Sequence, residues 1–203
     1  MQLDLRPLLL IALLFTCVFA TCKKDKDCVK ASYNFEVGVK ALPDVDSINI
    51  GDTIRLEVKE PVNLRDLTSG NFIDFSGAKN FSSVMAIGEL QGNGVERFAI
   101  NDFAYLLTEG SEVPSINVSR FKEFYFTERN GYYLFRLAVI PKKTGIYRIG
   151  FSDAANVFTN RNPCAKSAFG INFKDTDQHL YYNQWNFGVM PTLPNGVYCF
   201  KVK

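Results

Sequence analysis

The sequence has little of what metal-dependent or histidine-dependent catalysis uses. It contains one histidine in 203 residues, and none of the common nucleophile, zinc-protease, phosphate-loop or calcium-loop motifs occurs. A metal site or a serine triad would have to use His179, whose neighbours Asp175 and Asp177 equally suit the first turn of a short helix. We therefore expect no catalytic residue, no metal and no cofactor. A glycan hydrolase stays open as the alternative, because its two carboxylates can come from distant parts of a chain.

Charge of one sign is also not in excess. Lysine and arginine number 23 against 21 acidic residues, a net charge of +2. Nucleic-acid binding depends on a basic surface that neutralises phosphates, so we expect no nucleic-acid partner. Hydrophobic residues make up 47% and charged residues 22% of the chain. These values are typical of a globular protein, and the length predicts one domain.

No apolar run is long enough to span a membrane. The longest, residues 8–20, is uninterrupted but falls short of the roughly 20 residues that a transmembrane helix needs. It has the length of a signal-peptide core, and small residues follow it. A buried core helix is the alternative interpretation, but such a helix would show polar residues at a 3.6-residue period.

The residues after this run resemble the lipobox of bacterial lipoproteins. The match is Phe19-Ala20-Thr21-Cys22, and it departs from the usual pattern at Phe19 and Thr21. The Lys/Asp-rich residues 23–27 are similar to the export signal of Bacteroidota lipoproteins. The resemblance implies a signal peptide over 1–21 and lipidation of Cys22, a palmitate-type anchor. It also implies a polar tether over 22–32 and an outer-membrane location, on the cell surface or the periplasmic face.

Three cysteines remain after the expected cleavage site. An exported protein meets an oxidising environment, in which a disulfide can persist. We predict a Cys164–Cys199 disulfide, because Cys199 shares the outward face of a terminal strand over 197–203 and can reach an overlying loop. Cys28 lies near the tether and is then the odd thiol. A zinc site is the rival interpretation, but no C-x-x-C spacing occurs.

The rest of the chain shows the period of two that is typical of half-buried strands. Apolar and polar residues alternate most clearly in residues 33–40 and 54–59, and residues 71–76 and 83–90 are further expected strands. No internal repeat or second-domain boundary follows residue 32. We therefore expect a single domain over 33–203.

The clearest local feature is a hairpin over residues 124–139. Asn130-Gly131 is suited to the positive φ angles of a type I′ turn, whose twist matches a two-residue hairpin. Two apolar cross-strand pairs follow from this register: Phe126 with Phe135, and Phe124 with Leu137.

A second local pattern, Gly145-x-Tyr147 at the start of a strand, resembles the corner before strand F of immunoglobulin-like domains. The cysteine of that strand is replaced by Ile149, and the partner tryptophan is missing. The resemblance implies architecture only. The fold prediction is all-β: a single antiparallel immunoglobulin-like β-sandwich, with a loop or short-helix excursion near 152–196.

Within that excursion lies a cluster of aromatic residues, Tyr181, Tyr182 and Trp185, interleaved with amides. Aromatic rings can stack on sugars, but they can equally pack a loop against the sandwich. We take these three as candidate ligand contacts. The expected function is that of an outer-membrane lipoprotein held by its lipid. It serves as a non-catalytic binding or accessory module for a protein or glycan.

Overall fold

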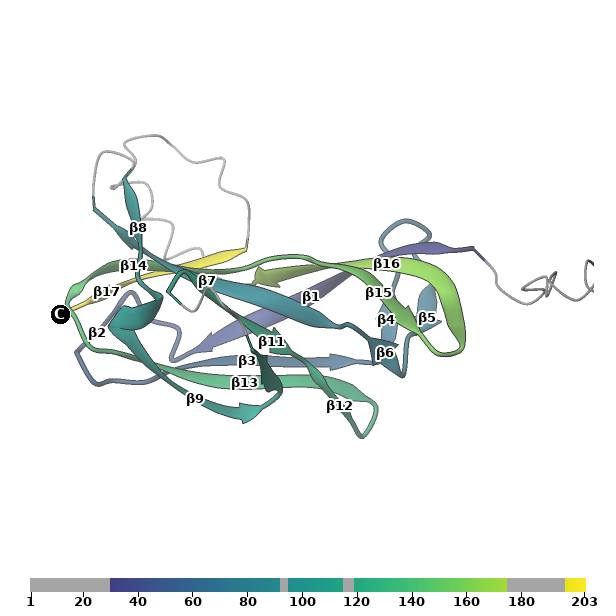
Figure 1. The fold of residues 1–203 in the computed structure, drawn as a ribbon, viewed down its shortest axis with the longest axis horizontal. Coiled ribbons are helices and arrows are strands. Elements are labelled where there is room, and N and C mark those ends of the chain that lie inside the picture. Colours follow the sequence, from purple (N-terminus) through teal and green to yellow (C-terminus); the bar gives the residue numbers. More distant parts are fainter. Residues whose placement is uncertain (1–29, 92–94, 115–118, 175–195) are drawn as a thin grey trace, which may run out of the picture.

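In a computed structural model the chain is described for residues 30–91, 95–114, 119–174 and 196–203. These residues form two sheets packed face to face, an elongated all-β sandwich (Figure 1). The predicted strands at 33–40 and 54–59 are present as β1 and β3, which confirms the all-β sandwich.

The larger sheet has eight strands. In spatial order they are β12 (Thr127–Arg129), β13 (Tyr132–Pro141), β3 (Ile54–Pro61), β1 (Ser32–Leu42), β16 (Asn162–Phe173), β15 (Ala154–Thr159) and β6 (Ala78–Lys79), with β9 (Phe103–Glu109) also beside β13.

The second sheet has seven strands. In spatial order they are β10 (Ser111–Val113), β11 (Phe121–Tyr125), β7 (Ser82–Leu90), β14 (Gly145–Phe151), β17 (Val197–Val202) and β2 (Ser47–Ile48), with β8 (Glu96–Phe98) also beside β7. A small ribbon of β4 (Asn63–Arg65) and β5 (Phe72–Asp74) and a 3₁₀ turn, η1 (Ile100–Asp102), complete the described structure.

Two features of the prediction need correction. The sheets are mixed, because β1 runs parallel to β16 and β17 runs parallel to β2. The first part of the expected excursion over 152–196 is instead the hairpin of β15 and β16, which extends the larger sheet. The long ladder from Ser32 to Val39 ties β16 into the fold. The predicted short helix lies in 175–195, outside the described residues.

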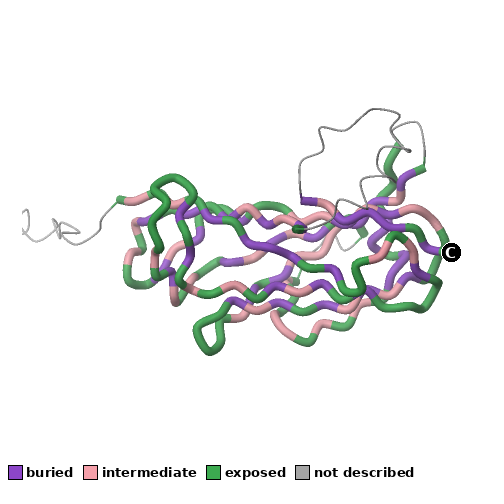
Figure 2. The backbone as a smooth tube through the Cα atoms, turned by 180° about the vertical axis from the view of Figure 1, so that it is seen from behind, coloured by how far each residue is buried: buried purple, intermediate pink, exposed green. Residues whose placement is uncertain are grey.

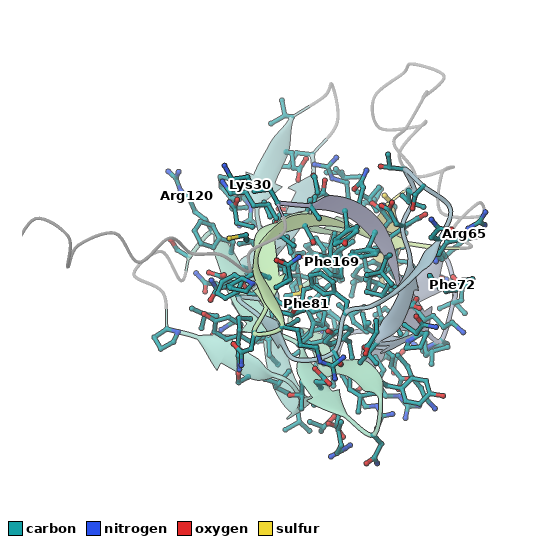
Figure 3. The ribbon with its side chains drawn as sticks, turned by 90° about the vertical axis from the view of Figure 1, so that its right-hand side faces the viewer. Lys30, Arg65, Phe72, Phe81, Arg120 and Phe169 are labelled. Atoms are coloured by element: carbon teal, nitrogen blue, oxygen red, sulfur yellow. The ribbon has the colours of Figure 1, made fainter. Side chains whose placement is uncertain are left out.

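Aromatic rings fill the space between the sheets. The rings of Phe81 and Phe169 lie 4.3 Å apart, and those of Phe35 and Phe169 5.0 Å apart. In the end-on view of Figure 3, Phe81 and Phe169 lie inside the two layers. Figure 2 shows how buried and exposed residues alternate along the strands. Each inward position therefore adds to one continuous core, as period-two strands require.

The predicted hairpin is present, but only one of its two predicted apolar cross-strand pairs is found. Asn130 and Gly131 have φ angles of 52° and 77°, and three residue pairs join β12 to β13. The rings of Phe126 and Phe135 lie 5.6 Å apart, as predicted. The predicted pairing of Phe124 with Leu137 is wrong, because the strand changes sheets at Phe126 and Phe124 pairs with β7. Its ring reaches Phe135 from the opposite sheet, at 5.4 Å.

The corner around Tyr147 has the expected geometry. The Tyr147 hydroxyl donates to the carbonyl oxygens of Lys143 and Thr144, both at 3.3 Å. Gly145 has a φ angle of 156°, which other residues rarely adopt, and a Cβ there would also crowd the Tyr147 ring at 3.1 Å, so glycine is favoured. Burial raises the pKa of Tyr147 to about 12.

The predicted Cys164–Cys199 disulfide is wrong. Cys199 is a free, buried thiol in β17. Its cross-strand neighbour is Arg148 of β14, which pairs with Glu96 of β8 at 2.5 Å. Cys164 belongs to β16, in the other sheet. The outward side of Cys199 is thus occupied by charged side chains of its own sheet, and no loop carrying Cys164 lies over it.

Candidate functional site

A row of alternating charges crosses the outer face of the larger sheet. Residue pairing places Lys40 of β1 beside Glu57 of β3, Glu57 beside Arg136 of β13, and Arg136 beside Glu109 of β9. These side chains face away from the core because alternate residues of a strand point to opposite faces. Opposite charges in directly opposed positions stabilise a sheet modestly. The row therefore adds modestly to the pairing of four strands and gives the outer face a mixed-charge surface.

The sheet opens beside this row. β1 pairs with β3 only over residues 40–42, and residues 32–39 before them pair with β16 instead. The two strands diverge at this point (Figure 1). The Gly38 amide, no longer facing a carbonyl oxygen of β3, donates to Oε1 of Glu60 at 3.1 Å. The divergence leaves a gap in the sheet face, where the Glu60 side chain accepts the hydrogen bond of the Gly38 amide.

This gap is a pocket of about 380 Å³, which we call the lysine pocket. Its lining is Gly38, Lys40, Glu57, Lys59, Glu60 and Lys174. All three lysines are exposed, and no ion pair within the described residues involves them. No apolar side chain lines it.

A second pocket of about 360 Å³ adjoins the first and shares Glu57 and Lys59 with it. We call it the tyrosine pocket. Tyr132 is 39% exposed, and the Lys59 ammonium lies 4.9 Å from the centre of its ring. Arg136 Nε donates to Glu57 Oε1 at 3.0 Å. The two pockets lie side by side over β1, β3 and β13, and we call them together the groove.

Gly38 shapes the floor of the lysine pocket. A Cβ at this position would lie 2.7 Å from Cδ and 2.9 Å from Cε of Lys174. Glycine thus allows the Lys174 side chain to lie across β1 and to bring its ammonium group to the pocket. A glycine inside a strand often marks such a close approach.

A second charged cluster surrounds Asp102 of η1, but both of its oxygens are already taken. Oδ2 pairs with Arg97 at 2.5 Å and Oδ1 with Lys143 at 2.6 Å. Burial raises the pKa of Asp102, but Lys143 and Arg97 outweigh this effect, and the net shift is downward. Because the carboxylate is buried and paired on both sides, the cluster holds η1 between β8 and β9 and has no oxygen left for a ligand.

The residues predicted as a site lie outside the described part of the chain. These are the candidate contacts Tyr181, Tyr182 and Trp185 and the lipidation site Cys22. Within the described ranges no group of three His, Cys, Asp or Glu side chains is placed to hold a metal ion. No helix of the described residues has the length and hydropathy of a membrane span.

The groove itself was missed at the sequence level. Lys40, Glu57 and Lys59 occupy ordinary outward positions of alternating strands, and Lys174 directly follows β16, which is far away in sequence. One signal was present: Gly38 interrupts the polar face of an otherwise regular strand, where a close approach is the usual reason.

Comparisons with known proteins identify no relative by sequence. No protein-family model matches the chain, and no curated protein matches it. Among solved structures, the human F-spondin reeler domain is 9% identical, with a TM-score of 0.41, over 90% of this chain and all of that one.

Two further solved structures are similar at lower TM-scores. A non-cellulosomal cohesin from the archaeon Archaeoglobus fulgidus is 13% identical with a TM-score of 0.25, over 75% of this chain and 99% of that one. The CupB6 tip adhesin from Pseudomonas aeruginosa is 13% identical with a TM-score of 0.20, over 76% of this chain and 43% of that one. At such scores none of the three carries an argument about function.

Proposed function

We propose that this chain is an exported lipoprotein, anchored to the outer membrane through Cys22, whose sandwich is a non-catalytic binding module. The groove on the larger sheet is its binding site, and the partner is a glycan or a protein. One observation carries the proposal: two adjoining pockets share a wall of charged side chains on an exposed sheet face.

The position of β1 supports the anchoring. This strand begins at Ser32, at the end of the sandwich opposite the C-terminus (Figure 1). The ten residues 23–32 would span at most about 33–36 Å if fully extended. With the lipid on Cys22, such a tether holds the domain near the membrane while the groove, on the flank of the sandwich, stays open to a partner.

The carboxyl groups of the groove favour binding over hydrolysis. Glu57 pairs with Arg136, and Glu109 pairs with Arg129, so a guanidinium group already faces each of these two carboxyl groups. A glycosidase needs one carboxyl group whose pKa is raised, so that it can donate a proton. The described carboxyl groups whose pKa is shifted, on Asp66, Asp74 and Asp102, are all shifted downward.

The test is a binding screen with a matched pair of variants. The full chain, purified in a neutral detergent, is screened on a glycan array and against envelope proteins. Arg136→Glu reverses a charge inside the groove, and Arg55→Glu reverses one on the same sheet face outside it. We expect the first variant to lose at least about fivefold in affinity and the second to keep wild-type affinity.

Equal binding by both variants would move the site away from the groove. Release of reducing ends from a bound glycan would replace the binding module with the surface hydrolase.

A further inference from the structure

We propose that the lysine pocket receives the negatively charged group of an acidic polysaccharide, such as a uronate carboxylate. This inference rests on the proposed binding function and names the class of partner. It is drawn from the charge, the lining and the backbone geometry of the pocket.

The charge around the pocket is unbalanced. The Glu57 carboxylate is taken up by Arg136, which leaves Glu60 as the one acidic group facing Lys40, Lys59 and Lys174. Three lysines therefore line the pocket against one glutamate that is in no ion pair of the described chain, and the total net charge is only +2. An excess of positive charge confined to one pocket attracts an anion and repels a cation.

The pocket already accommodates one carboxylate of the chain itself. Glu60 Oε1 accepts the Gly38 amide at 3.1 Å, in the gap where β1 leaves β3. The backbone here thus meets a carboxylate oxygen, and the lysines lie around it. A ligand carboxylate that enters beside Glu60 finds ammonium groups that are in no ion pair within the described residues.

The lining distinguishes a polysaccharide from a protein partner. Protein interfaces are anchored by buried aromatic or apolar side chains, and lysine and glutamate are depleted at their centres. The lysine pocket has only glycine, lysines and glutamates in its lining. An acidic sugar provides hydroxyl groups for those glutamates and a carboxylate for those lysines.

The groove also has the length that a polymer requires. From the lysine pocket it continues into the tyrosine pocket across Lys59 and Glu57. Tyr132, Arg129 and Arg136 there offer a partly exposed ring and further hydrogen-bond donors to the next sugar units. An acidic chain that lies across β1, β3 and β13 therefore occupies both pockets at once.

The experiment is calorimetric titration of the full chain in neutral detergent. The ligands are polygalacturonate and polyglutamate as acidic polymers and dextran as the neutral one. Two variants are compared with the wild type. The double variant Lys40→Gln/Lys174→Gln removes two charges of the pocket. The control Lys166→Gln removes one charge from β16, on the same face of the sheet but away from the groove.

We expect polygalacturonate to bind and dextran not to bind. The double variant should lose about tenfold or more in affinity, and Lys166→Gln should keep it. Affinity should fall steeply with added salt, because exposed charges are screened.

Three results would overturn the inference. Equal binding of dextran, unaffected by the lysine substitutions, would remove the acidic preference and leave the binding module standing. Binding of polyglutamate but not polygalacturonate would make the partner an acidic protein. Binding of neither acidic polymer would exclude the pocket as an anion site, while the array and envelope screen still decides the proposed function.

Discussion

The side chain of Lys174 lies in the space that a Cβ at Gly38 would occupy. That Cβ would lie 2.7 Å from Cδ of Lys174, closer than real Cβ contacts allow. The obstacle is the flexible end of a lysine and not a backbone atom, so the lysine can move away at little cost. The absence of one methyl group thus decides where an ammonium group sits.

Gly38→Ala should therefore weaken ligand binding without weakening the fold. The new methyl group displaces Lys174 from the lysine pocket, and alanine in a strand is about 0.5–1 kcal/mol better than glycine. We expect about a fivefold loss of polygalacturonate affinity with an unchanged or slightly higher Tm. In a Lys174→Gln background the same substitution should have no further effect, which a double-mutant cycle measures. Additive losses of affinity would show that Gly38 does not act through the position of Lys174.

Glu60→Gln should strengthen binding. The amide oxygen of glutamine still accepts the Gly38 hydrogen bond, but the repulsion between Glu60 and an anionic ligand is gone. We expect a gain of about three- to fivefold for polygalacturonate in calorimetric titration. Glu36→Gln, at an exposed outward position of the neighbouring strand β1, is the control. A loss of affinity in Glu60→Gln would mean that the carboxylate is itself a ligand contact.

Asp66 makes stability depend on acid pH. Its carboxylate accepts the amides of Asn34 at 2.8 Å and Ser69 at 2.9 Å. These bonds, the one from Asn34 foremost, lower the pKa of Asp66 to about 2, from an ordinary value of 3.8. The stabilisation is therefore fully present above pH 4 and is lost as the pH falls toward 2.

We expect Asp66→Asn to lower the Tm at pH 6, because its amide group points a donor at one of these amides. The difference from wild type should shrink near pH 2, where about half of the wild-type Asp66 carboxyl groups are protonated. Thermal unfolding at both pH values measures this. A Tm difference that stays constant with pH would show that the charge of Asp66 does not contribute to stability.

The thiol of Cys199 should be unreactive in the folded protein. It is 2% exposed, and burial raises its pKa to about 12, so almost no thiolate exists at pH 8. We expect iodoacetamide to leave it unmodified in the folded chain and to modify it completely in urea without reduction. Peptide mapping reads out both states. A Cys199 peptide that appears only after reduction would restore a disulfide at this position.

The expected anchor at Cys22 is tested by metabolic labelling. Cys22→Ala should abolish palmitate incorporation and release the protein from the membrane fraction, because a multiply acylated cysteine is the anchor. Cys17→Ala should leave both unchanged. Labelling that persists in Cys22→Ala and disappears in Cys17→Ala would place the acceptor five residues earlier.

Local sequence patterns were enough to predict the sandwich. Alternation predicted β1 and β3, Asn130-Gly131 predicted the turn between β12 and β13, and Gly145-x-Tyr147 predicted the corner. Each of these depends on neighbours within a few residues, where turn chemistry and side-chain period act directly. The crossing of the chain between sheets at Phe126 is not local, and the hairpin pattern alone does not show it.

The elements that sequence reasoning missed are held by distant contacts. The β15–β16 hairpin turns through Asn160 and Arg161 and has irregular register, so its alternation is weak in sequence. Its place in the sheet comes from β1, more than 120 residues earlier. The groove depends on the same contact, because Lys174 reaches Gly38 only once β16 lies beside β1. No spacing in the sequence encodes that approach.

The amide of Gly38 gives the most direct test of the binding site. In a two-dimensional NMR titration of the full chain with oligogalacturonate, we predict that the Gly38 and Lys174 amide signals shift saturably with one dissociation constant. The Lys166 amide, on the same sheet face, should stay in place. Saturable shifts confined to residues 175–195, with Gly38 and Lys174 unmoved, would contradict the account and place the site at the aromatic cluster instead.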